Sequence, residues 1–216
     1  MKQLTTLFAL LLLLIVTPMV VTSCTDNTDD EKQNLEFTTN WKKRNVAYFD
    51  SVLTLARQKV AEAQAQYGDD WQSHCEWRVF LSYAKVAGGP STDTICARVI
   101  NTGTGTESPL YTDSVKVNYM GHLIPTESYK DGRVFDHSGI YENNDYVFND
   151  NYSTPTTFNV SNLVEGFTTA LMHMHVNDRW MVYMSQEMAY KSSASGVMPA
   201  YSTLCFDMQL KQIIKK

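Results

Sequence analysis

The chain has 216 residues, with 18 basic and 23 acidic side chains and a formal net charge of −5 at pH 7. This mildly acidic balance, without a basic cluster, argues against a nucleic-acid-binding protein, because contact with phosphates needs positive charge.

The first 23 residues have the pattern of an export signal. Lys2 supplies a positive charge, and the apolar run at 7–21 is short for a membrane span of about 20 residues. The segment Val21-Thr22-Ser23-Cys24 resembles a bacterial lipobox, which implies removal of residues 1–23 and lipidation of the Cys24 thiol. Acyl chains on Cys24 would hold the protein on a membrane without a spanning helix.

Residues 24–37 begin with a polar, acidic stretch that has nothing to bury, so we expect a flexible tether. An acidic stretch directly behind a lipidated cysteine also resembles the surface-export signal of some Gram-negative lipoproteins. We therefore expect a lipid-anchored protein of the bacterial cell envelope, on the outer membrane, either facing the periplasm or exposed at the surface. The remaining length suits one ordinary domain with a small appendage.

Residues 38–70 are predicted to form an N-terminal helix that stops near Gly68. An apolar stripe recurs at spacings of three and four and consists of Val46, Phe49, Leu53, Ala56, Val60, Ala63 and Tyr67. This stripe favours packing of the helix against its own domain. The alternative is a homodimer seam, because heptad spacing persists for several turns, although a seam with two alanines would be weak.

Three cysteines follow Cys24, and three thiols cannot all pair within one chain. Cys205 alternates with core-facing neighbours and is expected to be a buried or partly buried free thiol. A Cys75–Cys96 disulfide stays open as an alternative, since an oxidising compartment would permit it.

After Trp71 the pattern changes to short strands separated by turns. Strands are predicted at 76–84, 94–100, 115–119, 180–184 and 204–210 from β-branched and aromatic residues or from strict alternation. A single short helix interrupts them, with Val164, Phe167 and Leu171 on its inward face. These elements predict an α+β fold, a curved antiparallel sheet wrapped around one short helix and preceded by a long N-terminal helix.

Several segments between Ile95 and Ile214 together resemble the FKBP-type peptidyl-prolyl isomerase family. They are Val117-Asn-Tyr119-Met-Gly121, Gly132-Arg-Val-Phe135-Asp136, Leu163-Val164-Glu-Gly-Phe167, Met174-His-Val-Asn-Asp-Arg179, Ala189-Tyr190, Val197-Met198-Pro199 and Thr203-Leu-Cys-Phe206. Their order and spacing carry the resemblance, which implies an FKBP-type domain at 71–216 with its core at 95–214.

The resemblance implies isomerisation of X–Pro bonds in an apolar pocket that needs no nucleophile, cofactor or metal. Walls and floor would be formed by Tyr119, Phe135, Phe158, Val164, Phe167 and Phe206. The Val164 N–H would hold one substrate carbonyl, the Tyr190 hydroxyl would donate to a second, and Asp136 would order the rim. Leu163, Val197 and Met198 would add substrate contacts. The implied partners are proline-containing polypeptides.

The chain departs from the family pattern at several places. Phe167 stands where tryptophan is usual, Thr156 where an aromatic residue is common, and Lys191 where glycine is usual. The segment 137–157 is longer than typical and rich in polar and aromatic residues, so it is expected at the rim of the cleft. These departures favour a second hypothesis, in which the domain keeps the fold but serves as a weakly active or non-catalytic binding or chaperone module.

Other site chemistries find less support. His173 and His175 could be read as a metal pair, but no nearby cysteine or carboxylate set completes a site. His122 and His137 lack a paired nucleophile for a hydrolase. Asp131 and Asp136 are too close along the chain for a two-carboxylate glycosidase.

Overall fold

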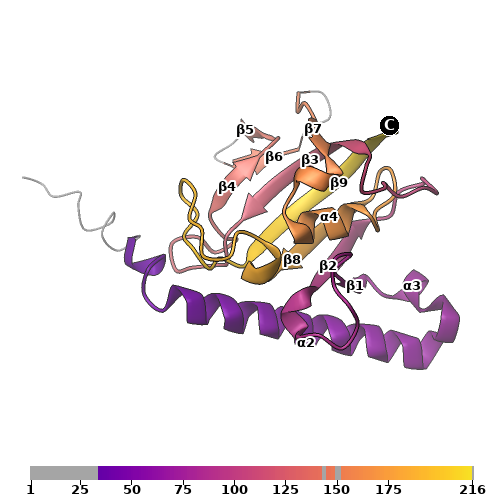
Figure 1. Ribbon diagram of the computed structural model, residues 1–216, viewed down its shortest axis with the longest axis horizontal. Helices are drawn as coiled ribbons and strands as arrows, with labels where there is room; N and C mark the ends of the chain where they lie inside the picture. The colour runs from indigo at the N-terminus through magenta and orange to yellow at the C-terminus, as the bar shows by residue number, and fades with distance from the viewer. Residues whose placement is uncertain (1–33, 143–144, 149–151, 216) are drawn as a thin grey trace, which may run out of the picture.

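The computed structural model describes residues 34–142, 145–148 and 152–215 (Figure 1). The predicted signal peptide at 1–23, Cys24 and residues 25–33 of the predicted tether therefore lie outside the described residues. Helix α2 (Trp41–Tyr67) is followed by the short helices η1 (Gly68–Asp70) and α3 (Trp71–His74). It begins after Asn40, which has a left-handed φ of 51°, and ends as predicted at Gly68, whose φ is 56°.

The core of the fold is a seven-stranded antiparallel sheet with the order β1-β2-β8-β9-β3-β4, in which β7 also pairs with β3. Its strands are β1 (Trp77–Leu81), β2 (Thr94–Asn101), β3 (Ser114–His122), β4 (Val134–His137), β7 (Thr156–Asn159), β8 (Arg179–Met184) and β9 (Leu204–Ile214). Strand β4 pairs with residues 120–122 of β3, and β7 pairs with residues 114–117. The two short strands thus occupy different halves of the same edge.

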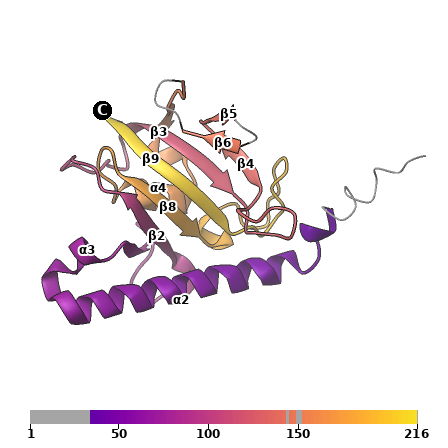
Figure 2. The same ribbon diagram turned by 180° about the vertical axis from the view of Figure 1, so that it is seen from behind.

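Two helices cover opposite faces of the sheet, as the alternation along β2 shows. Ile95 and Ala97 belong to the main core with α4 (Glu165–Leu171), whereas Cys96 packs with Phe49 of α2. Because successive side chains of a strand point to opposite faces, α4 and this part of α2 lie on different sides. Figure 1 views the sheet from the α4 side and Figure 2 from behind. The predicted α+β architecture is confirmed.

The buried stripe of α2 differs from the prediction at both of its ends. Val46 is 41% exposed, and Asn45, only 1% exposed, occupies the buried position instead. Farther along, Phe49, Leu53 and Ala56 are buried against Trp77 and Cys96, whereas Tyr67 at the C-terminal end is 39% exposed. The helix therefore packs against its own domain, and this stripe is not free to form a seam with a second copy. A homodimer would have to use another face of α2.

The three cysteines among the described residues are all free. Cys96 lies opposite Val79, four residues beyond Cys75. At about 3.3 Å per strand residue, that offset is too long for a disulfide, whose Cα atoms must lie within about 7 Å. The Cys75–Cys96 alternative is therefore wrong, whereas Cys205 is a buried free thiol as predicted.

The long segment between β4 and β7 forms a hairpin that the sequence did not predict. Its strands are β5 (Ile140–Glu142) and β6 (Asp145–Val147). Within the part of the chain that the structure describes, no helix combines the length and apolar character that a membrane span requires.

Candidate active site

Five aromatic rings from five different elements meet on the α4 side of the sheet. The Phe167 ring of α4 lies at their centre, with centroid distances of 5.1 Å to Phe206, 6.0 Å to Phe158 and 6.2 Å to Tyr119. Phe135 of β4 reaches the cluster through Phe206, at 5.5 Å. Each of these pairs is in an edge-to-face arrangement, which ring quadrupoles favour. The structure thus brings together all five rings that the sequence placed in one pocket.

Burial of these rings is graded from the centre outwards. Phe167, Phe206 and Tyr119 are 4%, 5% and 7% exposed, whereas Phe135 and Phe158 are partly buried. An apolar floor with half-covered walls can receive a small apolar group and exclude water from it.

The remaining predicted site residues lie around this cluster. Leu163 and Val164 are partly buried at the N-terminal end of α4. Tyr190 and Val197 are exposed by 44% and 42%. Met198, by contrast, is only 3% exposed and belongs to the main core, so it supports the site from within.

Two glycines permit the close packing of this cluster. A Cβ at Gly121 would lie 2.5 Å from Phe135 Cζ and 2.7 Å from Phe206 Cε1. A Cβ at Gly166 would lie 2.7 Å from the Met184 sulfur. All three distances are shorter than non-bonded contacts allow, so Gly121 lets the two rings approach β3 and Gly166 lets α4 lie close on β8.

The polar groups of the site centre on Asp136, which is exposed on β4. The Tyr119 hydroxyl donates a hydrogen bond of 2.9 Å to the Asp136 carboxylate. Burial, and then this hydrogen bond, raise the pKa of Tyr119. Burial and the charge of Asp136 likewise raise the pKa of Tyr190. Both phenols therefore stay neutral at physiological pH and can donate hydrogen bonds.

Sequence reasoning missed Ser138, which holds the backbone of Tyr119. The Tyr119 N–H donates to Ser138 Oγ at 2.9 Å, and the Ser138 N–H donates to the Tyr119 carbonyl at 2.9 Å. This double contact fixes the position from which Tyr119 reaches Asp136. A serine two residues after Asp136 carries no periodicity signal, so only the pairing of β3 with β4 reveals it.

Val164 takes the position that precedes α4. It is extended, with φ −62° and ψ 148°, and its carbonyl accepts the Thr168 N–H at 3.0 Å. Among the described residues, no hydrogen-bond partner of the Val164 N–H is found. This donor at the start of a helix is suited to hold an incoming carbonyl oxygen.

Apart from Phe167, which lies at the centre of the aromatic cluster, the departures from the family pattern lie at the rim or edge of the site. Lys191 has a left-handed φ of 55°, a conformation that glycine adopts without strain. Thr156 is partly buried on β7 opposite Val117. Tyr141 of β5 is 62% exposed and borders a hollow of about 720 Å³ that also reaches Phe135 and Val197.

The other end of the insertion does not lie at this rim. Phe148 packs under the Arg179 guanidinium, 5.1 Å from the ring centroid. Phe148 and Arg179 line a separate hollow with Cys205 and Asp207, side chains that point away from α4. The expectation that the whole insertion borders the cleft is therefore wrong for Phe148, because the chain wraps around the edge of the sheet. Residues 143–144 and 149–151 lie outside the described part.

The histidine pair is engaged in other contacts. The His173 ring stacks on Phe80 with a centroid distance of 4.0 Å, and His175 Nδ1 lies 3.5 Å from Asp178. Burial lowers the pKa of His173. In residues 34–142, 145–148 and 152–215, no group of three or more His, Cys, Asp or Glu side chains is placed to hold a metal.

Comparison with known proteins agrees with this geometry. Residues 105–211 match the family described as FKBP-type peptidyl-prolyl cis-trans isomerase. The chain is 35% identical over 133 residues to the FKBP-type 22 kDa peptidyl-prolyl cis-trans isomerase of Escherichia coli, covering 61% of this chain and 56% of that protein. It is 31% identical over 142 residues to the peptidyl-prolyl cis-trans isomerase Mip of Coxiella burnetii, covering 64% and 54%.

A third relative is also matched over about half of its length. The macrophage infectivity potentiator of Trypanosoma cruzi is 33% identical over 112 residues, with 51% of this chain and 48% of that protein covered. The chain thus spans about half the length of the curated relatives it matches. Among solved structures, FkpA from Escherichia coli superposes with a TM-score of 0.46 at 21% identity, covering 87% of this chain and 82% of that one.

Proposed function

Because residues 105–211 belong to the FKBP-type peptidyl-prolyl cis-trans isomerase family, we propose that this protein catalyses the cis–trans isomerisation of X–Pro bonds in polypeptides. Rotation about a peptide bond faces a barrier of about 18–20 kcal/mol, because the planar amide is stabilised by resonance. The reaction breaks no covalent bond, so it needs no nucleophile and no proton transfer.

The aromatic cluster supplies the physical basis of the reaction. In the twisted transition state the amide loses its resonance, and its carbonyl becomes less polar than in either planar form. A dry pocket that holds the prolyl ring over Phe167 therefore favours the twisted amide over the planar ones. A millionfold acceleration needs only about 8 kcal/mol of this preference.

The rim orients the substrate in this proposal. The Val164 N–H holds one substrate carbonyl, and the neutral Tyr190 hydroxyl donates to a second. Asp136, fixed by Tyr119, orders the same rim. Additional substrate contacts come from Phe158, Leu163 and Val197.

The observation that carries the proposal is the convergence of five rings around Phe167, with Asp136 close enough to Tyr190 for its charge to raise the pKa of that phenol. NMR exchange spectroscopy on a short Ala-Pro peptide tests it. We expect the wild type to accelerate exchange and the Tyr190→Phe, Phe135→Ala double variant to be at least tenfold slower. A Tyr111→Phe variant, altered in an exposed ring against Tyr83, is the matched control. Equal cis–trans exchange rates with the wild type and the double variant would refute the proposal.

A second candidate function is a binding or chaperone module with little turnover. The observation that favours it is the low exposure of Phe167, 4%, at a position where the family usually has the larger tryptophan. This alternative predicts that a proline-mimetic macrolide does not bind, while unfolded proteins are still protected from aggregation. Strong macrolide binding in calorimetry counts against it.

We also propose that the protein works in the cell envelope on exported proteins, anchored by acyl chains on Cys24. One relative, 32% identical over 119 residues, is the outer membrane protein MIP of Legionella longbeachae. Mass spectrometry of the mature N-terminus tests the anchor: an unmodified Cys24, or an uncleaved signal at 1–23, contradicts it. The homodimer through α2 stays a prediction, and light scattering of the soluble Cys24-onward form decides it.

A further inference from the structure

Tyr190 and Val197 stand on one loop, the rim loop (190–203), whose base is strained. Lys191 and Tyr201 both have left-handed φ values, 55° and 63°. The Tyr201 N–H donates to the Lys191 carbonyl at 2.7 Å and so closes the base of the loop. Non-glycine residues keep this conformation only where their surroundings hold them in it. The residues that pack against the rim loop therefore hold it in this shape.

The first turn of α2 contacts the end of the rim loop. The Trp41 Nε1–H donates to Ser202 Oγ at 3.0 Å, and the Ser202 hydroxyl donates to the Pro199 carbonyl at 2.6 Å. Trp41 is 5% exposed and Ser202 is also 5% exposed. Trp41 of the helix thus holds the Ser202 side chain, and Ser202 in turn holds the backbone of the loop at Pro199.

Asn45, one helical turn later, connects the helix to Thr203 through two hydrogen bonds. Its Oδ1 accepts the Thr203 N–H at 2.7 Å, its Nδ2 donates to the Trp41 carbonyl at 2.8 Å, and its own carbonyl accepts the Thr203 hydroxyl at 3.0 Å. Asparagine is a weak helix former, and a buried amide is costly unless it is satisfied. Both ends of the Asn45 amide are bonded, and a satisfied buried network specifies one arrangement of the groups it joins.

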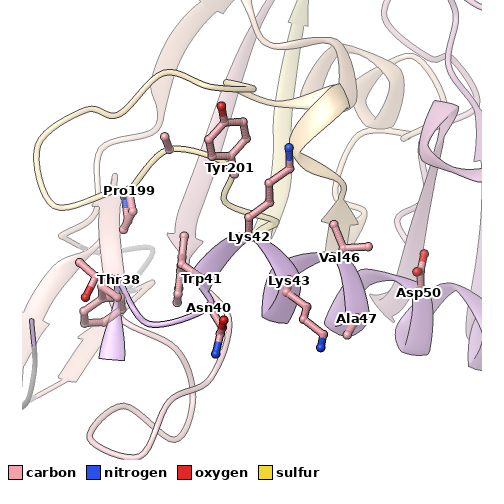
Figure 3. A pocket seen from close by; sticks show the side chains of 12 residues that line it. Thr38, Asn40, Trp41, Lys42, Lys43, Val46, Ala47, Asp50, Pro199 and Tyr201 are labelled. Atoms are coloured by element: carbon pink, nitrogen blue, oxygen red, sulfur yellow. The ribbon is translucent and has the colours of Figure 1, made fainter. Parts of the chain in front are cut away.

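On the outer side of this contact, the helix and the loop are separated by a hollow of about 930 Å³ (Figure 3). Its lining includes Val46 from the helix and Pro199 from the loop. Lys42 reaches across, with its Nζ 4.3 Å from the Tyr201 ring. Apolar packing between the two segments is therefore incomplete, and the buried hydrogen bonds of Trp41 and Asn45 set their relative position.

We propose that Asn45 and Trp41 are positioning residues for the isomerase site: through Thr203 and Ser202 they hold the rim loop in the strained shape that places Tyr190 beside Asp136. This inference rests on the proposed function, and it assigns to the N-terminal helix a part in turnover. A helix held only by apolar packing would not need a buried asparagine at this position.

The test compares Thr203→Val, which removes the hydroxyl but keeps the shape of the side chain, with Thr203→Ser, which restores the hydroxyl. Asn45→Ala is the stronger variant. Val60→Ala is the control, because Val60 is partly buried on the same helix but packs against the Phe49 cluster, away from the rim loop. Hydrogen exchange of the 190–201 amides and kcat and KM on an Ala-Pro peptide are measured on the full chain.

We expect loop amides to exchange about tenfold faster in Asn45→Ala and Thr203→Val than in wild type, and kcat/KM to fall about tenfold, mainly in kcat. Thr203→Ser restores both values. Val60→Ala lowers the melting temperature without changing either. Unchanged loop exchange in Asn45→Ala, or equal effects in Val60→Ala, overturns the proposal. A wild type without isomerase activity refutes the proposed function, and loop exchange then still decides whether the helix orders the loop.

Discussion

Lys191→Gly is expected to stabilise the protein, although it deletes a whole side chain. Lys191 has a φ of 55°, and its side chain is exposed. A left-handed conformation costs a residue with a Cβ about 1–2 kcal/mol, because the Cβ approaches the following carbonyl. Glycine avoids this strain but loses about 0.5–1 kcal/mol through its larger freedom in the unfolded chain. The expected net gain is about 0.5–1 kcal/mol.

Gly196 on the same loop provides the matched control. It has a φ of 54°, and an added Cβ would meet nothing within 4 Å. Gly196→Ala therefore introduces backbone strain without a steric clash, and we expect a loss of about 0.5–1 kcal/mol from the same two terms taken with opposite signs.

Urea unfolding monitored by tryptophan fluorescence measures both changes. For a domain of this size, about 1 kcal/mol corresponds to roughly 2–4 °C in melting temperature, so thermal melts provide a second readout. A destabilised Lys191→Gly together with a neutral Gly196→Ala would show that backbone conformation does not govern stability at these positions.

Three further predictions concern the site and the core. In Gly121→Ala, the new Cβ would lie 2.5 Å from Phe135 Cζ. We therefore expect the stability to be lower by about 1–3 kcal/mol and kcat/KM to fall at least tenfold. Wild-type values of both quantities would contradict the packing described. Tyr119→Phe removes the donor to Asp136 and should cost about 0.5–1.5 kcal/mol in urea melts, whereas no change would mean that the bond is not formed in solution. Burial raises the pKa of Cys205 to about 12. The folded state therefore holds the thiol neutral. The contribution of this thiol to the free energy of unfolding is at its full value below the unfolded-state pKa of about 8.5 and is lost as pH rises towards 12. The drop in melting temperature between pH 8 and pH 10.5 should be smaller in Cys205→Ala than in wild type, and an equal drop would argue against it.

Elements whose signal is local were predictable from the sequence. Alternation placed Trp180, Val182 and Met184 on one face of β8, and all three are buried. Gly68 marked the end of α2 because a residue without a Cβ accepts the left-handed conformation found there. The aromatic cluster was predicted from the resemblance to a known family, whose pattern implies that these rings share one pocket.

Features that depend on a distant partner could not be read in this way. Asn45 lies in the buried stripe only because Thr203, far along the chain, supplies its hydrogen-bond partners. Periodicity predicted Val46 at the buried position, but Val46 lines a hollow and is not packed in a core. Phe148 likewise lies across the sheet edge because Arg179 offers its ring a cation there.

In the proposed mechanism, Phe167 forms the floor on which a prolyl ring rests. A crystal structure of the protein with a short X–Pro peptide tests it most directly. We expect the prolyl ring within about 4 Å of Phe167 and Phe206, one carbonyl within about 3 Å of the Val164 nitrogen, and a second within about 3 Å of the Tyr190 hydroxyl. A peptide bound elsewhere, with Phe167 still covered by the protein's own side chains, would contradict it.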